Sequence, residues 1–485
     1  MKIINRLFIA LFAVFAATSC SDDFFDVNTS ENNPSSSTPQ LSLPVAQKYT
    51  VDLLSGDYNS YNTLGNLWSY AWAAGGDYVY FTDETQYLMA SSFRQGNFNT
   101  AYLRPLNNYQ VIINNTDPVN ANYKAIAMIM KAFHFQYLVD QYGDVPYTEA
   151  LQRGNNVTPA YDDDQFIYND LIVQLTAAQD MITASASDAT VIVPGTEDVM
   201  CGGDMAKWAK FANSLKLRIL LRQSEIGVTD YSSVNNGIGF LGAGETVYCN
   251  PGYTNDTNKQ NPLYANFGKT VAGDPAANAN ATRATPWALT QFGPNDTRLR
   301  RVYSVVGNGN PVTGPVAGID QNSAAGTPSA NLSGIGPGVL LSSSQDAIIM
   351  QSAESLLLQS EAVLRGFIPG DAEALYNAAV QESFTQLGAG SAATYLANEG
   401  AYPGTVSGII SQKWIALNGT NGLENWIEYK RTGFPLGLPN APGAAAPGTI
   451  PVRLLYPATE AATNPDNVPV QTTGDAFASK VFWDN

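Results

Sequence analysis

Gly203-Asp-Met-Ala-Lys-Trp-Ala-Lys-Phe-Ala-Asn-Ser-Leu-Lys-Leu-Arg218 is an amphipathic segment that predicts a helix from about Asp204 to Gln223. Its apolar side chains recur every three or four residues, which puts them on one face of a helix. The members of this stripe are Trp208, Phe211, Ala212, Leu215 and Ile219. A helix with a wide apolar face must bury that face against other elements, so the segment predicts the interior of a helical body.

The same helical spacing recurs along the chain, whereas no strong alternation typical of strands does. One helix is expected from Tyr123 to Tyr142, ended by Gly143. Another follows Asp162-Asp163-Asp164, and its inward-facing residues are predicted to be Phe166, Leu171, Leu175 and Ala178. The other predicted helices are Gln351–Arg365, Asp371–Leu387, Val406–Leu417 and Leu423–Arg431. The fold class is therefore predicted to be mainly α.

Two of the predicted helices form a pair, and one long region departs from the helical pattern. Gln351–Arg365 and Asp371–Leu387 predict a hairpin in which Ala372, Tyr376 and Ala379 have the spacing of tetratricopeptide helix pairs. An ordinary antiparallel helix hairpin explains that spacing equally well. Residues 240–345 are instead rich in Gly, Asn, Pro and Thr, with one helical stretch expected near Thr285–Val305. Long irregular segments are usually binding surfaces, so this region is expected to form a ligand-binding lobe.

Composition excludes several functional classes. The chain has 485 residues, 45% of them hydrophobic and only 14% charged, so a large core with a neutral polar surface is expected. Its formal net charge of −17 argues against a nucleic-acid partner. A single histidine, His134, excludes multi-histidine metal sites, and three cysteines exclude a disulfide scaffold.

The N-terminal residues predict export and a lipid anchor. Lys2 and Arg6 precede an apolar run from Leu7 to Ala17, which is too short to span a bilayer but has the length of a signal peptide. Small residues then lead directly to Cys20, which is typical of a lipoprotein cysteine that carries acyl chains such as palmitate. A plain secretory signal cut near Ser19 is the alternative. We expect a signal peptide at 1–19, a lipidated flexible tether at 20–40 and the folded body from residue 41 onward.

Signatures of catalysis are sparse. No phosphate-binding loop, nucleophile elbow or His-Glu-x-x-His segment occurs in the sequence. Asp162-Asp163-Asp164 lacks the glycine and the distant glutamate of a calcium loop, which favours a helix cap. His134 is expected to pack in a helix, hydrogen-bonded to backbone or to a tyrosine. Cys201 and Cys249 are either paired or free, and the residues do not decide between these alternatives. No metal or cofactor is expected.

Aromatic residues give the main indication of a ligand site. A cluster of them surrounds Gly75-Gly76-Asp77, and Trp287 flanks the loop-rich region. Aromatic faces stack on sugars or on peptide side chains, although Trp68 and Trp72 at helical spacing also fit a buried face. The predicted ligand-binding residues are Trp72, Tyr78, Tyr80, Phe81 and Trp287, assisted by the loops at 306–345.

Eight segments, taken in order, resemble the SusD/RagB-like nutrient-binding outer-membrane lipoproteins. These segments are Cys20–Thr29, Tyr137–Leu151, Gly203–Arg218, Asn295–Leu299, Ser360–Gly366, Gln412–Leu417, Gly422–Gly433 and Val452–Pro457. In the fourth segment Thr297 replaces the proline usual in the family. The resemblance spans nearly the whole mature chain, which would make residues 41–485 one SusD-like nutrient-binding domain.

The resemblance implies a fold of tetratricopeptide-like helix pairs (an α-α superhelix) with a loop-rich ligand-binding lobe. It also implies a lipid-anchored protein on the cell surface that acts as the lid of a TonB-dependent, SusC-like barrel transporter. Such a lid captures oligosaccharides or peptides without catalysis. The alternatives are a surface glycoside hydrolase or peptidase, and a structural or adhesive protein. The family's ligand residues vary, and Val316-Ala317-Gly318 lacks the tyrosine usual in a loop near the ligand.

Overall fold

The computed structural model describes residues 37–307, 309–444 and 448–484, so the signal peptide and nearly all of the tether lie outside the described residues. Helix α9, Met205–Arg222, forms where the sequence predicts it. The Asp204 carboxylate caps it by accepting a hydrogen bond from the Lys207 amide. All five residues of the predicted stripe are buried, which confirms that α9 lies in the interior.

Helices dominate the described residues, and the strands are short. The helices of the first half are α2 Pro39–Ser55, α3 Tyr61–Trp68, α4 Thr82–Thr85, α5 Gln95–Ala101, α6 Asn107–Ile113, α7 Ala121–Tyr142, α8 Asp164–Ser185 and α9. Those of the second half are α10 Pro262–Phe267, α11 Pro286–Thr290, α12 Leu299–Val302, α13 Ser352–Leu364, α14 Ala372–Gln386, α15 Ala393–Leu396, α16 Val406–Leu417, α17 Gly422–Thr432, α18 Ala458–Thr463 and α19 Asp475–Ala478. The strands are β1 Trp72–Ala74, β2 Val247–Cys249, β3 Thr282–Ala284 and β4 Ala347–Met350.

Short helical turns complete the chain. A π-helical stretch, Tyr102–Leu106, joins α5 to α6. Single 3-10 turns occur at Pro118–Asn120, Arg153–Asn155, Ser224–Ile226, Ser232–Val234 and Ser329–Asn331. Within the described ranges, no helix is both long and apolar enough to cross a membrane.

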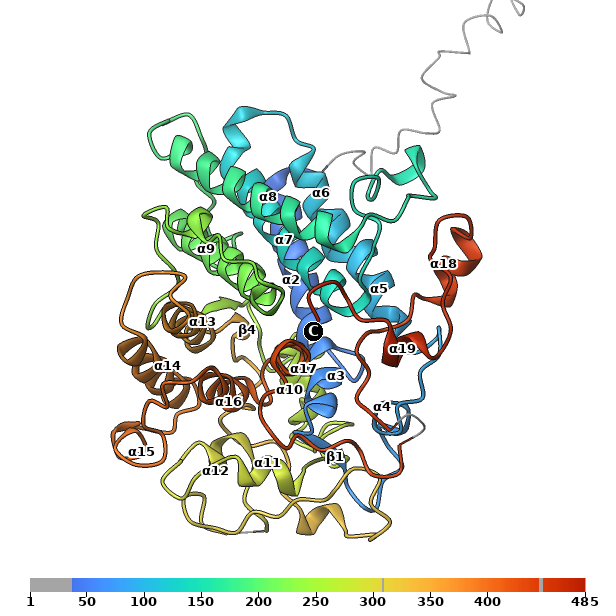
Figure 1. The fold of residues 1–485 in the computed structure, drawn as a ribbon, viewed down its shortest axis with the longest axis vertical. Coiled ribbons are helices and arrows are strands. Elements are labelled where there is room, and N and C mark those ends of the chain that lie inside the picture. Colours follow the sequence, from blue (N-terminus) through green and yellow to red (C-terminus); the bar gives the residue numbers. More distant parts are fainter. Residues whose placement is uncertain (1–36, 308, 445–447, 485) are drawn as a thin grey trace, which may run out of the picture.

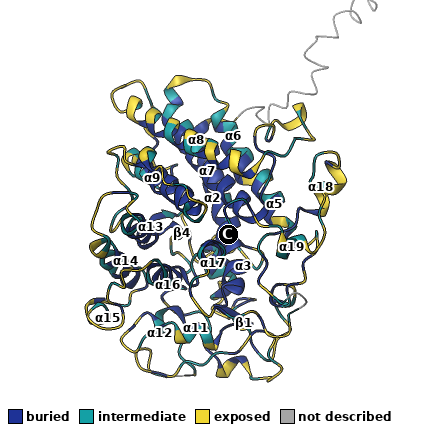
Figure 2. Cartoon of the chain, viewed as in Figure 1, coloured by how far each residue is buried: buried dark blue, intermediate teal, exposed yellow. Residues whose placement is uncertain are grey.

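The long helices form an arc around a buried centre. Figure 1 shows α7, α8 and α9 in the upper half, with α13, α14 and α16 continuing the arc down the left side. Neighbours α7 and α8, α13 and α14, and α3 and α17 make the most extensive helix contacts. In Figure 2 the helices nearest the centre are almost entirely buried, whereas exposed residues lie along the periphery. The predicted hairpin of α13 and α14 is therefore confirmed as part of a helical scaffold.

The loop-rich region lies at one end of this scaffold, along the lower edge of Figure 1. Two antiparallel strand pairs fix it there: β1 pairs with β3, and β2 pairs with β4. The predicted helical stretch at 285–305 is present as the short helices α11 and α12. Some helices of the structure were not predicted from the sequence. They include α10 and the N-terminal helices α2, α3, α5 and α6.

One inward-facing assignment is wrong. Phe166 is 48% exposed, whereas Leu171, Leu175 and Ala178 are buried as predicted. The buried stripe of α8 begins at Ile167 and continues through Leu171, at a spacing of four residues. Phe166 precedes that stripe by one residue, a rotation of about 100° that turns its side chain toward solvent.

Charged residues from five helices meet in the interior, in what we call the buried ion cluster. Its members are Asp140, Arg218, Arg222, Glu354, Glu361, Lys413, Glu424, Glu428 and Arg431, none of them more than 2% exposed. They come from α7, α9, α13, α16 and α17. Because buried charges are tolerated only when they are paired, this cluster fixes how five helices meet.

Overpacking the α13–α14 contact should destabilise the scaffold. Ala379 is fully buried against a cluster that includes Ala353, Leu356 and Tyr376. Ala379→Trp is therefore expected to lower the free energy of unfolding by about 1–3 kcal/mol in urea denaturation. Ala374→Trp, on the exposed side of the same helix, is the matched control and should change it by less than about 0.5 kcal/mol. Equal stabilities for the two variants would contradict the observed packing.

Candidate functional site

The predicted aromatic segment follows a tight turn at the end of β1. The Tyr78 amide donates to the Gly75 carbonyl at 2.9 Å, which closes the turn. The Gly76 amide donates to the Thr327 carbonyl at 3.0 Å, and a Cβ on Gly76 would lie only 2.4 Å from the Thr327 nitrogen. Glycine is therefore required at Gly76, because the turn lies directly against the 326–329 backbone.

Asp77 fastens this turn to the distant loop. Its carboxylate accepts hydrogen bonds from the Ser329 amide at 3.0 Å and from the Ser329 hydroxyl. The Ser329 carbonyl in turn accepts from Arg283 Nε at 2.8 Å. The hydrogen bond from the Ser329 side chain holds the pKa of Asp77 below its usual range. The segments predicted to share a ligand surface, 68–81 and 306–345, are thus brought together.

Two of the predicted ligand residues are core residues, which corrects that part of the prediction. Trp72 and Phe81 are each 1% exposed. Trp72 lies on β1 and packs against Phe267, with ring centroids 5.4 Å apart. Phe81 stacks on Tyr58 at 5.3 Å. Because both rings are enclosed by protein, neither presents a face to a ligand in this structure.

Tyr78 is the best exposed of the predicted aromatics. It is 40% exposed, and Val79 beside it is 95% exposed, so the pair forms the tip of the turn. Tyr80 is half-buried: its hydroxyl donates to the Asn278 side chain, and its ring contacts Tyr58 edge-on at 5.1 Å. Tyr78 therefore has the accessible face that stacking requires, whereas Tyr80 also supports the local fold.

Trp287 lies apart from this tip. It belongs to α11, which follows β3, and its ring meets Trp414 edge-to-face at 5.1 Å. In the β1–β3 pair Trp72 lies opposite Ala284, and Ala74 lies opposite Thr282. Tyr78 follows the Ala74 end of this pair, whereas Trp287 follows Ala284 at the other end. The structure therefore does not bring Trp287 and Tyr78 into one cluster, and a role of Trp287 in binding stays a prediction.

A cavity of about 440 Å³ opens beside the Asp77–Ser329 contact. Its walls include aromatic, apolar, hydroxyl and cationic side chains. These residues are Tyr264, Phe267, Lys269, Arg283, Ser304, Ser329, Leu332 and Pro337. The guanidinium of Arg283 donates to the carbonyls of Ser329, Ala279 and Thr282. Burial lowers the pKa of Arg283, although the charge of Asp77 opposes this. That cation is already hydrogen-bonded, and Lys269 at the exposed edge is the other charged residue in the wall. The remaining wall residues are apolar or neutral polar, which suits a neutral polar ligand.

We call this end of the molecule the loop face: the tip at Tyr78 and Val79, the Asp77–Ser329 contact and the adjoining cavity. Sequence reasoning missed Asn278, Arg283 and Ser329, which organise it. They are ordinary polar residues in a loop-rich region. Asn278 and Ser329 gain their role from contacts with Tyr80 and Asp77, 198 and 252 positions away, and Arg283 gains its role through Ser329.

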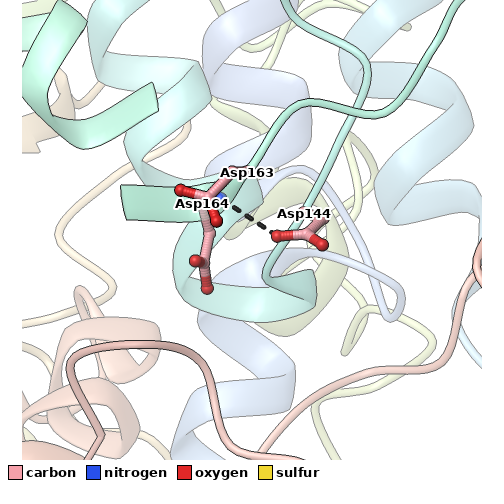
Figure 3. Close-up of side chains that lie close together, drawn as sticks. All are labelled: Asp144, Asp163 and Asp164. Carbon is pink, nitrogen blue, oxygen red and sulfur yellow. Dashed lines mark hydrogen bonds between the residues drawn. The ribbon is translucent and has the colours of Figure 1, made fainter. Parts of the chain in front are cut away.

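The acidic segment before α8 acts as a helix start, as predicted. Asp163 Oδ1 accepts from the Phe166 amide at 2.8 Å, and Asp144 Oδ1 accepts from the Asp164 amide at 3.0 Å. Figure 3 shows these three carboxylates gathered at the first turn of the helix. Burial and the neighbouring carboxylates raise the pKa of Asp164 to about 6. Asp162 instead accepts from the Tyr147 and Thr148 amides and fastens the preceding loop.

The remaining candidates have structural roles. His134 is buried in α7. Its Nε2 is hydrogen-bonded to the Thr50 hydroxyl at 2.9 Å, whereas the expected partner was a backbone group or a tyrosine. Burial lowers the pKa of His134 to about 3, so the imidazole is neutral at pH 7. Cys201 and Cys249 are both free thiols, which decides between the two alternatives left open by the sequence. Burial raises the pKa of both thiols, so neither is an activated nucleophile.

Comparison with known proteins agrees with the fold. A family model named SusD-like and described as "Starch-binding associating with outer membrane" matches residues 31–457. A solved structure titled a chitin-binding protein has a TM-score of 0.72 at 25% identity, covering 92% of this chain and 100% of its own. A chitin-binding SusD homologue from Flavobacterium johnsoniae has a TM-score of 0.74 at 21% identity, covering 92% and 98%.

A SusD homologue from Bacteroides vulgatus has a TM-score of 0.71 at 22% identity, covering 92% of this chain and 97% of its own. None of the curated protein sequences matches this chain. The mainly α, tetratricopeptide-like fold expected from the sequence is thereby confirmed.

Proposed function

The chain belongs to the SusD-like family of glycan-binding proteins associated with the outer membrane, and on that premise we propose that it captures neutral oligosaccharides at the cell surface. The proposal extends to the delivery of these oligosaccharides, chemically unchanged, to a TonB-dependent, SusC-like barrel transporter for which this chain is the lid. We also propose that acyl chains on Cys20 anchor the protein to the outer membrane.

The observation that carries the proposal is the family match over residues 31–457, together with two chitin-binding structures of the same fold. The loop face supports it from the chemistry of this chain. Tyr78 offers an aromatic face, and the adjoining cavity offers carbonyl and hydroxyl groups without an unpaired charge at Arg283. Sugars combine apolar C–H faces with neutral hydroxyls, so this combination favours a glycan over an ionic ligand.

Tyr78→Ala is expected to weaken binding of a chitooligosaccharide by about 1–2 kcal/mol, because truncation removes the exposed stacking face. Isothermal titration calorimetry with chitohexaose, and with maltohexaose for comparison, measures the change. Tyr78→Phe is the matched control, since it keeps the ring and loses only the hydroxyl. Tyr80→Ala should reduce stability as well as affinity, because Tyr80 also holds Asn278. If Tyr78→Ala and the wild type bind equally, the ligand site lies elsewhere on the loop face.

The absence of catalysis is tested separately. We expect oligosaccharides and peptides to be recovered intact after prolonged incubation with the purified protein, as judged by mass spectrometry. Cleaved products would instead support the alternative of a surface glycoside hydrolase or peptidase. Capture of the protein from solubilised outer membranes should bring a barrel transporter with it, and a preparation that lacks one would refute the proposed lid role.

Cys20→Ala is expected to move the protein from the membrane fraction to the soluble fraction, or to stop its maturation. The reason is that stable anchoring requires two acyl chains, which only the cysteine at the processing site would carry. Fractionation followed by intact-mass measurement provides the test. Cys201→Ala is the control and should remain in the membrane fraction. A Cys20→Ala protein that is still membrane-bound and normally processed would refute the anchor.

A further inference from the structure

A second hollow surface lies far from the loop face, around α5, α6 and the loop at 146–159. Two cavities open there, of about 1060 Å³ and 830 Å³. They share four wall residues: Asn107, Ala150, Leu151 and Arg153. Because these residues line both, the two cavities adjoin, and we call them together the N-terminal groove. In Figure 1 its helices α5, α6 and α18 lie on the upper right, opposite the lower edge that carries the loop-rich region.

Several exposed apolar side chains line the groove. Leu103 is 72% exposed and Val157 is 74% exposed, and both line the second cavity. Leu41 and Val45 line the first cavity and are 67% and 41% exposed. Single exposed apolar residues are ordinary, but a set that follows one groove marks a surface that another segment covers.

Its charge is opposite to that of the chain as a whole. Arg153 lies where the two cavities meet, and Lys131 lines the first cavity. Lys131 Nζ donates to the neutral Gln110 Oε1 at 2.8 Å, and the Asp170 carboxylate is close enough to act on its charge. The acidic Glu460 lies at the other end of the second cavity, where it accepts from the Tyr161 hydroxyl at 2.8 Å. In a chain of net charge −17, such a groove favours an acidic segment that also carries apolar side chains.

The chain itself contains a segment of that chemistry close by. Ser37, the first described residue, lines the groove, so the tether joins the folded body at this surface. The tether includes Asp22-Asp23-Phe24-Phe25-Asp26-Val27, which combines three carboxylates with three large apolar residues. Nine residues, 28–36, separate this segment from Ser37 and can span up to about 32 Å. The connecting chain is therefore long enough for the segment to fold back onto this surface.

We propose that residues 22–27 of the tether dock in the N-terminal groove, with Phe24 and Phe25 against Leu103 and Val157 and the aspartates toward Arg153. Docking shortens the free part of the tether to the few residues next to Cys20. It therefore holds the N-terminal groove close to the site of attachment and leaves the loop face directed away from it. This inference does not depend on the identity of the ligand at the loop face.

Photo-crosslinking tests the proposal in the full chain. Phe25→p-benzoylphenylalanine is irradiated, and the attachment sites are identified by peptide mass spectrometry. We expect crosslinks within one chain, concentrated in the peptides that contain Leu103 and Val157. The groove variant Leu103→Asp/Val157→Asp should reduce their yield about fivefold or more, since its charges repel the acidic segment. Val79→Asp, at an exposed apolar site on the loop face, is the control and should leave the yield unchanged.

Three outcomes would overturn the proposal. Crosslinks scattered over the surface, or absent, would show that the segment does not occupy the groove. Crosslinked dimers whose yield falls on dilution would show that a second copy supplies the contact. A yield unaffected by Leu103→Asp/Val157→Asp, with both variants folded as judged by circular dichroism, would show that these apolar side chains do not hold the segment.

Discussion

Glu428→Ala is expected to lower the free energy of unfolding by about 3–5 kcal/mol, the loss typical of a broken buried ion pair. Arg222, Lys413 and Arg431 all reach the Glu428 carboxylate, with Lys413 at 3.2 Å and Arg431 at 2.5 Å. Alanine would leave these three cations buried with one carboxylate fewer. Since whole domains are stable by only about 5–15 kcal/mol, urea unfolding should show a large shift in the midpoint.

Two further variants separate charge from packing. Glu428→Gln keeps the volume and one acceptor, so it should destabilise less than alanine, and the difference measures the cost of the cavity and the lost hydrogen bonds. Lys48→Ala removes the exposed i,i+4 pair with Asp52 and should cost less than about 1 kcal/mol. If Glu428→Ala and Lys48→Ala unfolded at the same urea concentration, the ion cluster would contribute nothing to the fold.

The pKa of the neighbouring Glu424 reflects the cations that surround it. Burial alone would raise it, but Arg218, Arg222 and Lys413 outweigh burial and lower the pKa of Glu424 to about 2. The charged form is therefore favoured inside the protein, even though the side chain is fully enclosed. Asp140 shows the opposite balance, because burial raises its pKa against the attraction of Arg222. The charge state of each carboxylate thus depends on how many cations surround it.

The sequence predicted the helices with strong periodicity and missed what depends on distant partners. α9 and the α13–α14 hairpin follow from local spacing, because their apolar residues repeat at helical intervals. The ion cluster does not, since Arg222 and Glu428 are 206 positions apart and nothing local marks them as a pair. The inward-facing assignment of Phe166 was wrong for a related reason. A shift of one residue rotates a side chain by about 100° around the helix and so changes the face on which it lies.

The candidate site shows the same limit. The aromatic residues around Gly75-Gly76-Asp77 indicated a ligand site, and Tyr78, which closes the turn at these glycines, is exposed. Trp72 and Phe81 have the same residue types, but Phe267 and Tyr58 cover them. Asp77 binds Ser329 across 252 positions, so the loop that completes the site was identifiable only as irregular sequence. An aromatic residue in a loop-rich region therefore indicates a ligand site only after its packing is known.

Gly65→Ala is expected to destabilise the protein by about 3 kcal/mol, at the upper end of what overpacking usually costs. Gly65 lies in α3, where a Cβ would come within 2.0 Å of the Gly422 carbonyl carbon and 2.1 Å of the Leu423 nitrogen on α17. These atoms belong to the backbone and cannot rotate away. One methyl group should therefore force the two helices apart, and thermal unfolding measures the result.

Separation of α3 and α17 would break more than one contact. The Asn62 carboxamide accepts from the Gly422 amide at 2.9 Å, and the Asn66 carboxamide accepts from the Gly419 amide at 2.9 Å. Trp68 and Trp426 also meet edge-to-face across this interface at 4.8 Å. Gly96→Ala is the matched control, because Gly96 also lies in a helix but a Cβ there meets nothing within 4 Å.

Alanine is the better helix former, so the control should be neutral or stabilising by up to about 1 kcal/mol. The same substitution in two helices is thus expected to have opposite signs, and the contact of Gly65 with Gly422 is the reason. A Gly65→Ala protein as stable as Gly96→Ala would mean that α3 and α17 do not approach as closely as their glycines allow. In that case the position of β1, which follows α3 and leads to the turn at Tyr78, would rest on other contacts.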